Sequence, residues 1–160
     1  MTFDPHRPVA FEWVSGEARE TSLDEVHAAL ERMWERTRPP ADDVFRMLFD
    51  TAVAEVAANI LEHARPDRGT MRVDLELSVW PDRVEARFSD DGRPMAQRIV
   101  ARGLGASDLP PERGRGLHMA LVALDELGYE SVEGRNEWRL VKRRPAMAPS
   151  GSAEAAGHNA

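Results

Sequence analysis

Two polar residues one helical turn apart interrupt a segment of small apolar residues, AVAEVAANILEHA, at positions 52–64. Glu55 and Asn59 share one stripe of a helix, at the border of the apolar face that holds Val56 and Ile60. An Asn carbonyl oxygen suits Mg²⁺, which takes few protein ligands and completes its shell with phosphates and waters. A carboxylate one turn away could accept the proton of a hydroxyl that attacks a phosphate. A solvated helix edge without any ligand has the same spacing, so the pair alone leaves both interpretations open.

A second candidate is Asp90, at the end of the predicted strand VEARFSDDG. Apolar and polar residues alternate along this strand, and the same alternation turns Asp90 inward and Asp91 outward. An inward carboxylate requires hydrogen-bond donors, and the exocyclic amino group of a purine is one such donor. Gly92 would let a flat ligand approach the backbone. Alternatively, Asp90 only caps the backbone amides of a DDG turn.

A third candidate is the segment ERGRGLHMALVAL, in which Gly114 and Gly116 lead into a predicted amphipathic helix. Leucines mark this helix, and Gly128 is expected to cap its end. The amides and dipole of a helix N-terminus favour anions such as phosphates, and Arg113 and Arg115 could add contacts. The segment lacks the third glycine of a dinucleotide fingerprint and the GK[ST] of a P-loop. A basic loop in water is an equally good interpretation of the arginines.

The elements that must position these residues follow from hydrophobic periodicity and capping residues. We expect α+β architecture: a two-layer sandwich with helices on one face of a mixed, mainly antiparallel sheet. A loop that is partly helical at 96–101 connects positions 92 and 116. The low-complexity end, 145–160, is predicted to be a disordered tail after a domain at 1–144. The expected strands are at 9–14, 70–80, 84–92, 129–134 and 136–143, and the other helices at 23–38 and 41–65.

Composition excludes several classes of protein. The chain has 160 residues, of which 42% are hydrophobic, enough for one domain with a real core. With 21 basic and 28 acidic residues its net charge is −7, which disfavours direct binding to nucleic acid. It has no cysteine, so disulfides, thiolate zinc sites and thiol catalysis are excluded. No membrane-spanning run or signal pattern is evident, so a cytoplasmic protein that does not enter the membrane is expected.

The three candidates in this order are far more specific than any one of them. An Asn in a helix, D-x-G-x-P at the end of a strand and G-x-G-L at the start of a helix resemble the Bergerat-fold ATPases. This superfamily includes gyrase, heat-shock chaperones, histidine kinases and mismatch-repair ATPases. Within it, residues 9–143 resemble the anti-sigma factor serine/threonine kinases, in which a proline at the position of Pro94 is common.

The resemblance implies a role for each matched residue. EVAANILEHA implies Glu55 as the catalytic base and Asn59 as the Mg²⁺ ligand. SDDGRP implies that Asp90 binds the adenine amino group of ATP, beside Gly92 and Pro94. The third motif implies contacts with the phosphates from the residues of GRGL, namely Gly114, Arg115, Gly116 and Leu117.

The implied activity is ATP-dependent phosphorylation of a serine or threonine on a STAS-domain anti-sigma factor antagonist. Such kinases also bind an RNA polymerase sigma factor and often form homodimers, so both partners are implied here. Two other hypotheses remain: a module that binds ATP or sequesters a partner without catalysis, and a phosphorelay or phosphatase-linked regulator. Glu55 favours the enzyme, because a module without chemistry needs no base at that position.

Overall fold

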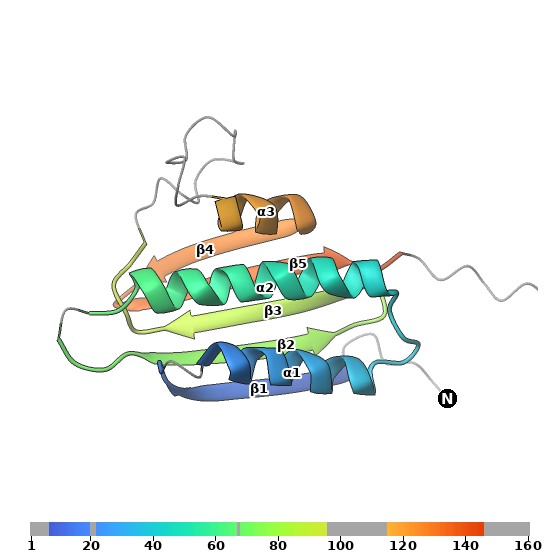
Figure 1. Cartoon of the computed structure of the whole chain (residues 1–160), viewed down its shortest axis with the longest axis horizontal. Coiled ribbons are helices and arrows are strands. Elements are labelled where there is room, and N and C mark those ends of the chain that lie inside the picture. Colours follow the sequence, from blue (N-terminus) through green and yellow to red (C-terminus); the bar gives the residue numbers. More distant parts are fainter. Residues whose placement is uncertain (1–6, 20–21, 67, 96–114, 146–160) are drawn as a thin grey trace, which may run out of the picture.

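The structure of the chain, a computed structural model, describes residues 7–19, 22–66, 68–95 and 115–145. Its strands form one sheet in the spatial order β1-β2-β3-β5-β4, and every neighbouring pair is antiparallel. The helices cover one side of this sheet (Figure 1). The predicted α+β, two-layer architecture is therefore confirmed, with a fully antiparallel sheet in place of a mixed one. The elements are β1 (Ala10–Glu17), α1 (Ser22–Arg36), α2 (Asp43–His63), β2 (Arg72–Val79), β3 (Arg83–Asp90), α3 (Arg115–Ala123), β4 (Glu126–Val132) and β5 (Arg135–Arg143).

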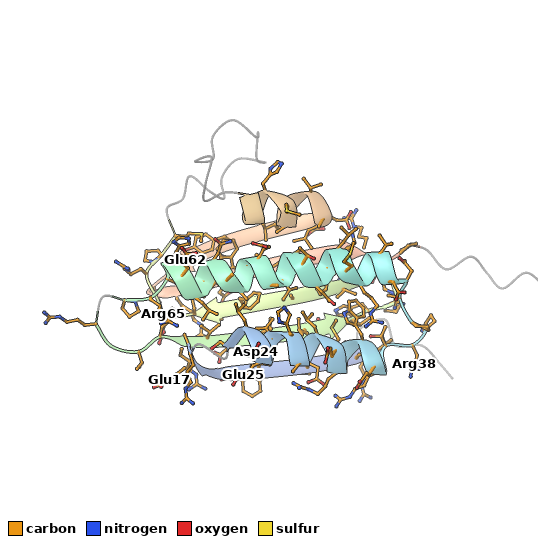
Figure 2. The ribbon with its side chains drawn as sticks, viewed as in Figure 1. Glu17, Asp24, Glu25, Arg38, Glu62 and Arg65 are labelled. Atoms are coloured by element: carbon orange, nitrogen blue, oxygen red, sulfur yellow. The ribbon has the colours of Figure 1, made fainter. Side chains whose placement is uncertain are left out.

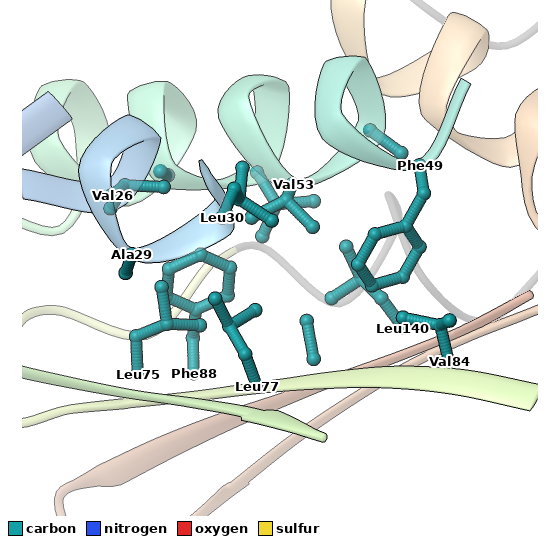
Figure 3. Close-up of a cluster of buried hydrophobic side chains, with 14 of the residues drawn as sticks. Val26, Ala29, Leu30, Phe49, Val53, Leu75, Leu77, Val84, Phe88 and Leu140 are labelled. Atoms are coloured by element: carbon teal, nitrogen blue, oxygen red, sulfur yellow. The ribbon is translucent and has the colours of Figure 1, made fainter. Parts of the chain in front are cut away.

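Helix α2 is the central element of the helical layer. Its N-cap Asp42 accepts a hydrogen bond from the backbone N–H of Phe45 at 2.9 Å. From there its apolar side chains, among them Phe49 and Val53, point down onto the sheet (Figure 3). They meet inward side chains such as Phe88 of β3, all buried together with α1 residues in one core. Helix α3 packs alongside α2, so α2 is held on three sides.

Two buried carboxylates on the sheet are neutralised by arginines. Glu12 lies on the inward side of β1, where Arg32 and Arg36 of α1 reach it, Arg32 at 3.1 Å. Glu85 points outward from β3, as its parity predicts, yet it is only 4% exposed. Arg87 and Arg139 donate to it at 2.6 and 3.1 Å and cover it. Ion pairs between neighbouring elements thus bury charges that a single strand's pattern would leave in water.

The predicted end of the third helix is wrong. Helix α3 ends at Ala123, and Gly128 lies within strand β4 opposite Arg139. At this end Lys142 Nζ of β5 donates to the Ala123 oxygen at 2.7 Å, which satisfies a carbonyl group that the helix itself leaves without a donor. Two residues later the backbone N–H of Asp125 donates to Val141 and starts the pairing with β5. The helical spacing of leucines continues past Ala123, so the sequence pattern alone did not show where the helix ends.

Some predictions fall outside the described residues, namely the helical turn at 96–101, Gly114 and the tail from 146 to 160. In the part of the chain that is described, no helix has the length and apolar character needed to cross a membrane.

The end of α2 meets the end of β3 at very close range. The backbone N–H of Arg93 donates to the carbonyl oxygen of Ala64, the α2 C-cap, at 2.7 Å. A Cβ atom added to Gly92 would lie 2.2 Å from that oxygen and 2.5 Å from Met71 Sδ. Only glycine permits this approach, so one reason for Gly92 is the contact between helix and strand.

We expect Gly92→Ala to lower the free energy of unfolding by about 1–3 kcal/mol, because the new methyl group must push the α2 C-cap away from β3. Gly128→Ala is the matched control, since nothing lies within 4 Å of its added Cβ atom. That variant should stay within about 0.5 kcal/mol of the wild type. Urea unfolding of the three proteins measures the difference, and equal stability of the two variants would contradict the close contact.

Candidate functional site

Asp90 is the most unusual polar residue at the end of β3. It is 2% exposed and faces the helical layer, as the alternation of the strand predicts. Its Oδ1 accepts hydrogen bonds from Gly92 N at 3.0 Å and from Asn136 Nδ2 at 2.7 Å. Its Oδ2 is buried and receives no hydrogen bond from any described residue. The two interpretations from sequence are therefore compatible, because Oδ1 serves the turn and Oδ2 is left for another donor.

Burial raises the pKa of Asp90 above its ordinary value. The hydrogen bonds from Asn136 and Gly92, and the charge of Arg135, counteract part of this effect, while Asp91 adds to it. A carboxylate with one unsatisfied oxygen and a raised pKa is a common feature of binding and catalytic sites.

A small hollow of about 10 Å³ lies next to Asp90. One side is the last turn of α2, including Ile60 and His63, and the other is formed by β4, β5 and the residues after β3. The described residues leave room here for about one water molecule. The hollow thus brings the end of the Asn59 helix and the Asp90 motif to one place. Its lining residues are Ile60, His63, Ala64, Asp90, Arg93, Met95, Tyr129 and Trp138.

Glu55 and Asn59 are both half-buried on α2, at the edge of the apolar face as predicted. Asn59 Nδ2 donates to the backbone oxygen of Glu55 at 2.9 Å, which turns the amide along the helix. No described residue donates to Asn59 Oδ1 or pairs with the Glu55 carboxylate, so both groups are available to a ligand. Glu62 is solvent-facing, near the end of α2 and Arg65 (Figure 2), and His63 Nε2 lies 3.7 Å from its carboxylate.

The structure describes most of the other predicted site residues, but not all of them. Pro94 lies two residues after Gly92 in the loop that follows β3. The backbone of Arg115, Gly116 and Leu117 forms the first turn of α3, which packs beside α2. Gly114 lies outside the described residues, so its contact with phosphates stays a prediction. Among the described residues no group of three or more His, Asp or Glu side chains could hold a metal ion by itself.

Sequence reasoning missed Asn136 and Tyr129. Asn136 on β5 is the direct cross-strand partner of Asp90 and is 1% exposed. The alternation of NEWRLVKR contains a signal for it, because Asn136 shares the inward side with Trp138 and Leu140. Tyr129 on β4 reaches Asn136 Oδ1 with its hydroxyl group at 3.1 Å. The contact of Tyr129 with Asn136 arises from the pairing of β4 with β5, so the sequence around Tyr129 alone could not predict it.

A larger hollow, of about 640 Å³, lies on the side of the sheet that carries no helix. Trp13, Arg87 and Arg139 are among its lining residues, and both arginines are engaged by Glu85. The hydrogen bonds of these arginines, together with their charges, outweigh burial and hold the pKa of Glu85 below its ordinary value. None of the binding or catalytic residues predicted from sequence lines this hollow, so the candidate site is the region around Asp90.

Comparison with known proteins places this geometry in a family. The family model described as "Histidine kinase-like ATPase domain" matches residues 16–142. A crystal structure of the RsbU and RsbW domains of Rv1364c from Mycobacterium tuberculosis has a similar fold, with a TM-score of 0.56 and 19% sequence identity. The similarity covers 85% of this chain and 33% of that one, so the chain spans about a third of the larger protein. No curated protein sequence matches this chain.

The raised pKa of Asp90 predicts how stability depends on pH. The folded protein holds the Asp90 proton more tightly than the unfolded chain does, because the ordinary pKa of an Asp carboxyl group is 3.8 and folding raises it. Wild-type stability should therefore lose a contribution as pH rises from 3.8 through the raised pKa. Asp90→Asn does not titrate, so its free energy of unfolding relative to the wild type should increase across this window and then level off. Urea unfolding of both proteins from about pH 4 to pH 7 cancels the other titrating groups. A flat or falling difference would contradict the prediction.

Proposed function

This chain belongs to the histidine kinase-like ATPase family, and on that premise we propose that it is an ATP-dependent protein serine/threonine kinase. It acts in the cytoplasm as an anti-sigma regulatory factor in a partner-switching pathway. Its substrate is a serine or threonine of a STAS-domain anti-sigma factor antagonist, and the competing partner is an RNA polymerase sigma factor, bound by a homodimer of this chain. The fold shared with a structure that contains an RsbW domain supports this branch of the family.

The observation that carries the proposal is the unsatisfied Oδ2 of Asp90. A buried acceptor without a donor destabilises the protein, and a ligand N–H removes that cost when it binds. The 6-amino group of adenine supplies such a donor. A guanine presents a carbonyl oxygen at the same ring position, which would repel the carboxylate. Asp90 therefore supports an adenine nucleotide as the ligand.

The remaining residues suit the phosphate end of that nucleotide. Asn59 Oδ1 would hold Mg²⁺, which neutralises phosphate charge when it is bound. The first turn of α3, from Arg115 to Leu117, offers backbone N–H groups to the phosphate oxygens. Glu55 accepts the proton of the substrate hydroxyl group while the oxygen of that hydroxyl group forms a bond to the γ-phosphorus. The bond between that phosphorus and the bridging oxygen breaks, and ADP leaves.

Nucleotide binding is tested by calorimetric titration of the protein with ATP, with and without Mg²⁺. We expect binding that Mg²⁺ strengthens and that Asp90→Asn weakens about tenfold or more, because a hydrogen bond to a charged acceptor is worth about 1.5–3 kcal/mol. Asp91→Asn is the control, since Asp91 is exposed and its carboxylate contacts the backbone of Arg72. A folded wild type that does not bind ATP, or equal weakening by both variants, would reject the site.

Catalysis is tested by transfer of label from ATP to a STAS-domain protein that copurifies with the chain. Glu55→Gln should slow transfer by about 10²–10⁴-fold and leave ATP affinity unchanged, because it removes only the proton acceptor. Glu62→Gln, which alters an exposed carboxylate of the same helix, should behave like the wild type. Undiminished transfer by Glu55→Gln would reject the base. ATP binding without any phosphoprotein would instead support a module that sequesters its partner.

A further inference from the structure

The geometry around Asp90 points to Asn136 as the positioning residue that decides which nucleobase this site accepts, with Tyr129 holding Asn136 in place. This inference rests on the proposed function and adds two residues that the sequence motifs do not contain. Asn136 occupies one oxygen of the Asp90 carboxylate and thereby presents the other to the base.

The first support is the set of contacts of the Asn136 amide nitrogen. Asn136 and Asp90 are direct partners in the pairing of β5 with β3, and both are buried. Nδ2 donates to Asp90 Oδ1 at 2.7 Å. It also lies 3.1 Å from the backbone oxygen of Gly92 and 3.3 Å from that of Arg93. One amide group therefore ties the carboxylate to the loop that follows it.

The second support is Tyr129, which determines the orientation of that amide. Its hydroxyl group accepts the backbone N–H of Met95 at 2.6 Å, so its own proton is free to donate to Asn136 Oδ1 at 3.1 Å. A flipped amide would set Oδ1 against three acceptor oxygens and Nδ2 against the hydroxyl proton. The flipped state is thus strongly disfavoured, and Asn136 can only donate to Asp90.

These contacts give the carboxylate two unequal oxygens. Oδ1 receives two N–H groups and is fully engaged, whereas Oδ2 receives none from the residues that the structure describes. A base that donates at this position completes the set, and a base that presents a carbonyl oxygen meets an acceptor. Sites that hydrogen-bond a substrate donor reject analogues without it far more strongly than apolar pockets reject a missing methylene group. Without Asn136 only the Gly92 N–H still holds Oδ1, so the carboxylate turns more easily and this discrimination weakens.

Asn136 also limits the rise in the pKa of Asp90 that burial causes. After burial, its hydrogen bond has the largest influence on the pKa of Asp90, and it acts downward. Removing Asn136 therefore raises that pKa further, and a protonated Oδ2 no longer accepts a hydrogen bond. The acid limit of nucleotide binding then moves to higher pH. Among the described residues, the other charged or titratable groups near Asp90 are His63 on α2, Tyr129 on β4, Arg135 on β5, and Asp91 and Arg93 in the loop.

The experiment measures dissociation constants for ADP and inosine diphosphate across pH. Inosine diphosphate differs from ADP in carrying a carbonyl oxygen in place of the 6-amino group. For Asn136→Ala we expect about tenfold weaker ADP binding, a smaller preference for ADP over inosine diphosphate, and an acid limit at higher pH. Tyr129→Phe should change the ADP affinity, the preference for ADP and the acid limit in the same directions as Asn136→Ala does, but by smaller amounts. Glu137→Ala, an exposed neighbour on β5, should match the wild type.

Tyr129→Phe keeps the test decisive if Asn136→Ala does not fold. It removes only the hydroxyl group and retains the ring that packs against Trp138, with ring centroids 4.6 Å apart. A folded variant that weakens both nucleotides equally, with an unchanged acid limit, would show that Asn136 and Tyr129 are merely structural and would overturn the inference. A wild type that binds neither nucleotide, or shows no preference for ADP, would instead overturn the proposed function.

Discussion

The contact between the end of α2 and the end of β3 is the constraint on which the candidate site depends. It consists of the hydrogen bond from Arg93 to the Ala64 carbonyl and the absence of a side chain at Gly92. Because Ala64 directly follows α2 and Gly92 closely follows Asp90, this contact fixes the helix that carries Glu55 and Asn59 relative to the buried carboxylate. A bulkier residue at 92 would separate the two parts of the site before it met any ligand.

The same contact explains why the glycine of the second motif has two purposes. The sequence suggested that Gly92 leaves space for a flat ligand, whereas its missing Cβ faces the α2 C-cap and Met71. Its backbone N–H also donates to Asp90 Oδ1. Gly92 thus holds the helix close and helps to orient the carboxylate, and these roles remain whether or not a ligand touches it.

Sequence predicted those features that one segment decides by itself. Alternation along VEARFSDDG placed Asp90 inward, and the helical spacing of Glu55 and Asn59 placed both at the edge of the core. What failed depends on pairs of segments. The end of α3 coincides with contacts to β5, from Lys142 to Ala123 and from Asp125 to Val141, and Glu85 is covered by Arg139 from the neighbouring strand. The same is true of Asn136, whose importance arises only because antiparallel pairing sets it opposite Asp90.

Three other carboxylates of the described chain, two buried (Glu12 and Glu85) and one half-buried (Asp50), have the donors that Asp90 Oδ2 lacks. Glu12 is held by two arginines of α1, and Glu85 by arginines of β3 and β5. Asp50, whose pKa burial raises, accepts the indole N–H of Trp34 at 2.7 Å. This fold therefore has the means to satisfy a buried carboxylate, and at Asp90 it satisfies one oxygen with two donors while leaving the other without any. A polar atom left unsatisfied beside well-satisfied ones lowers stability, and such a cost is typical of a site whose missing partner is the ligand.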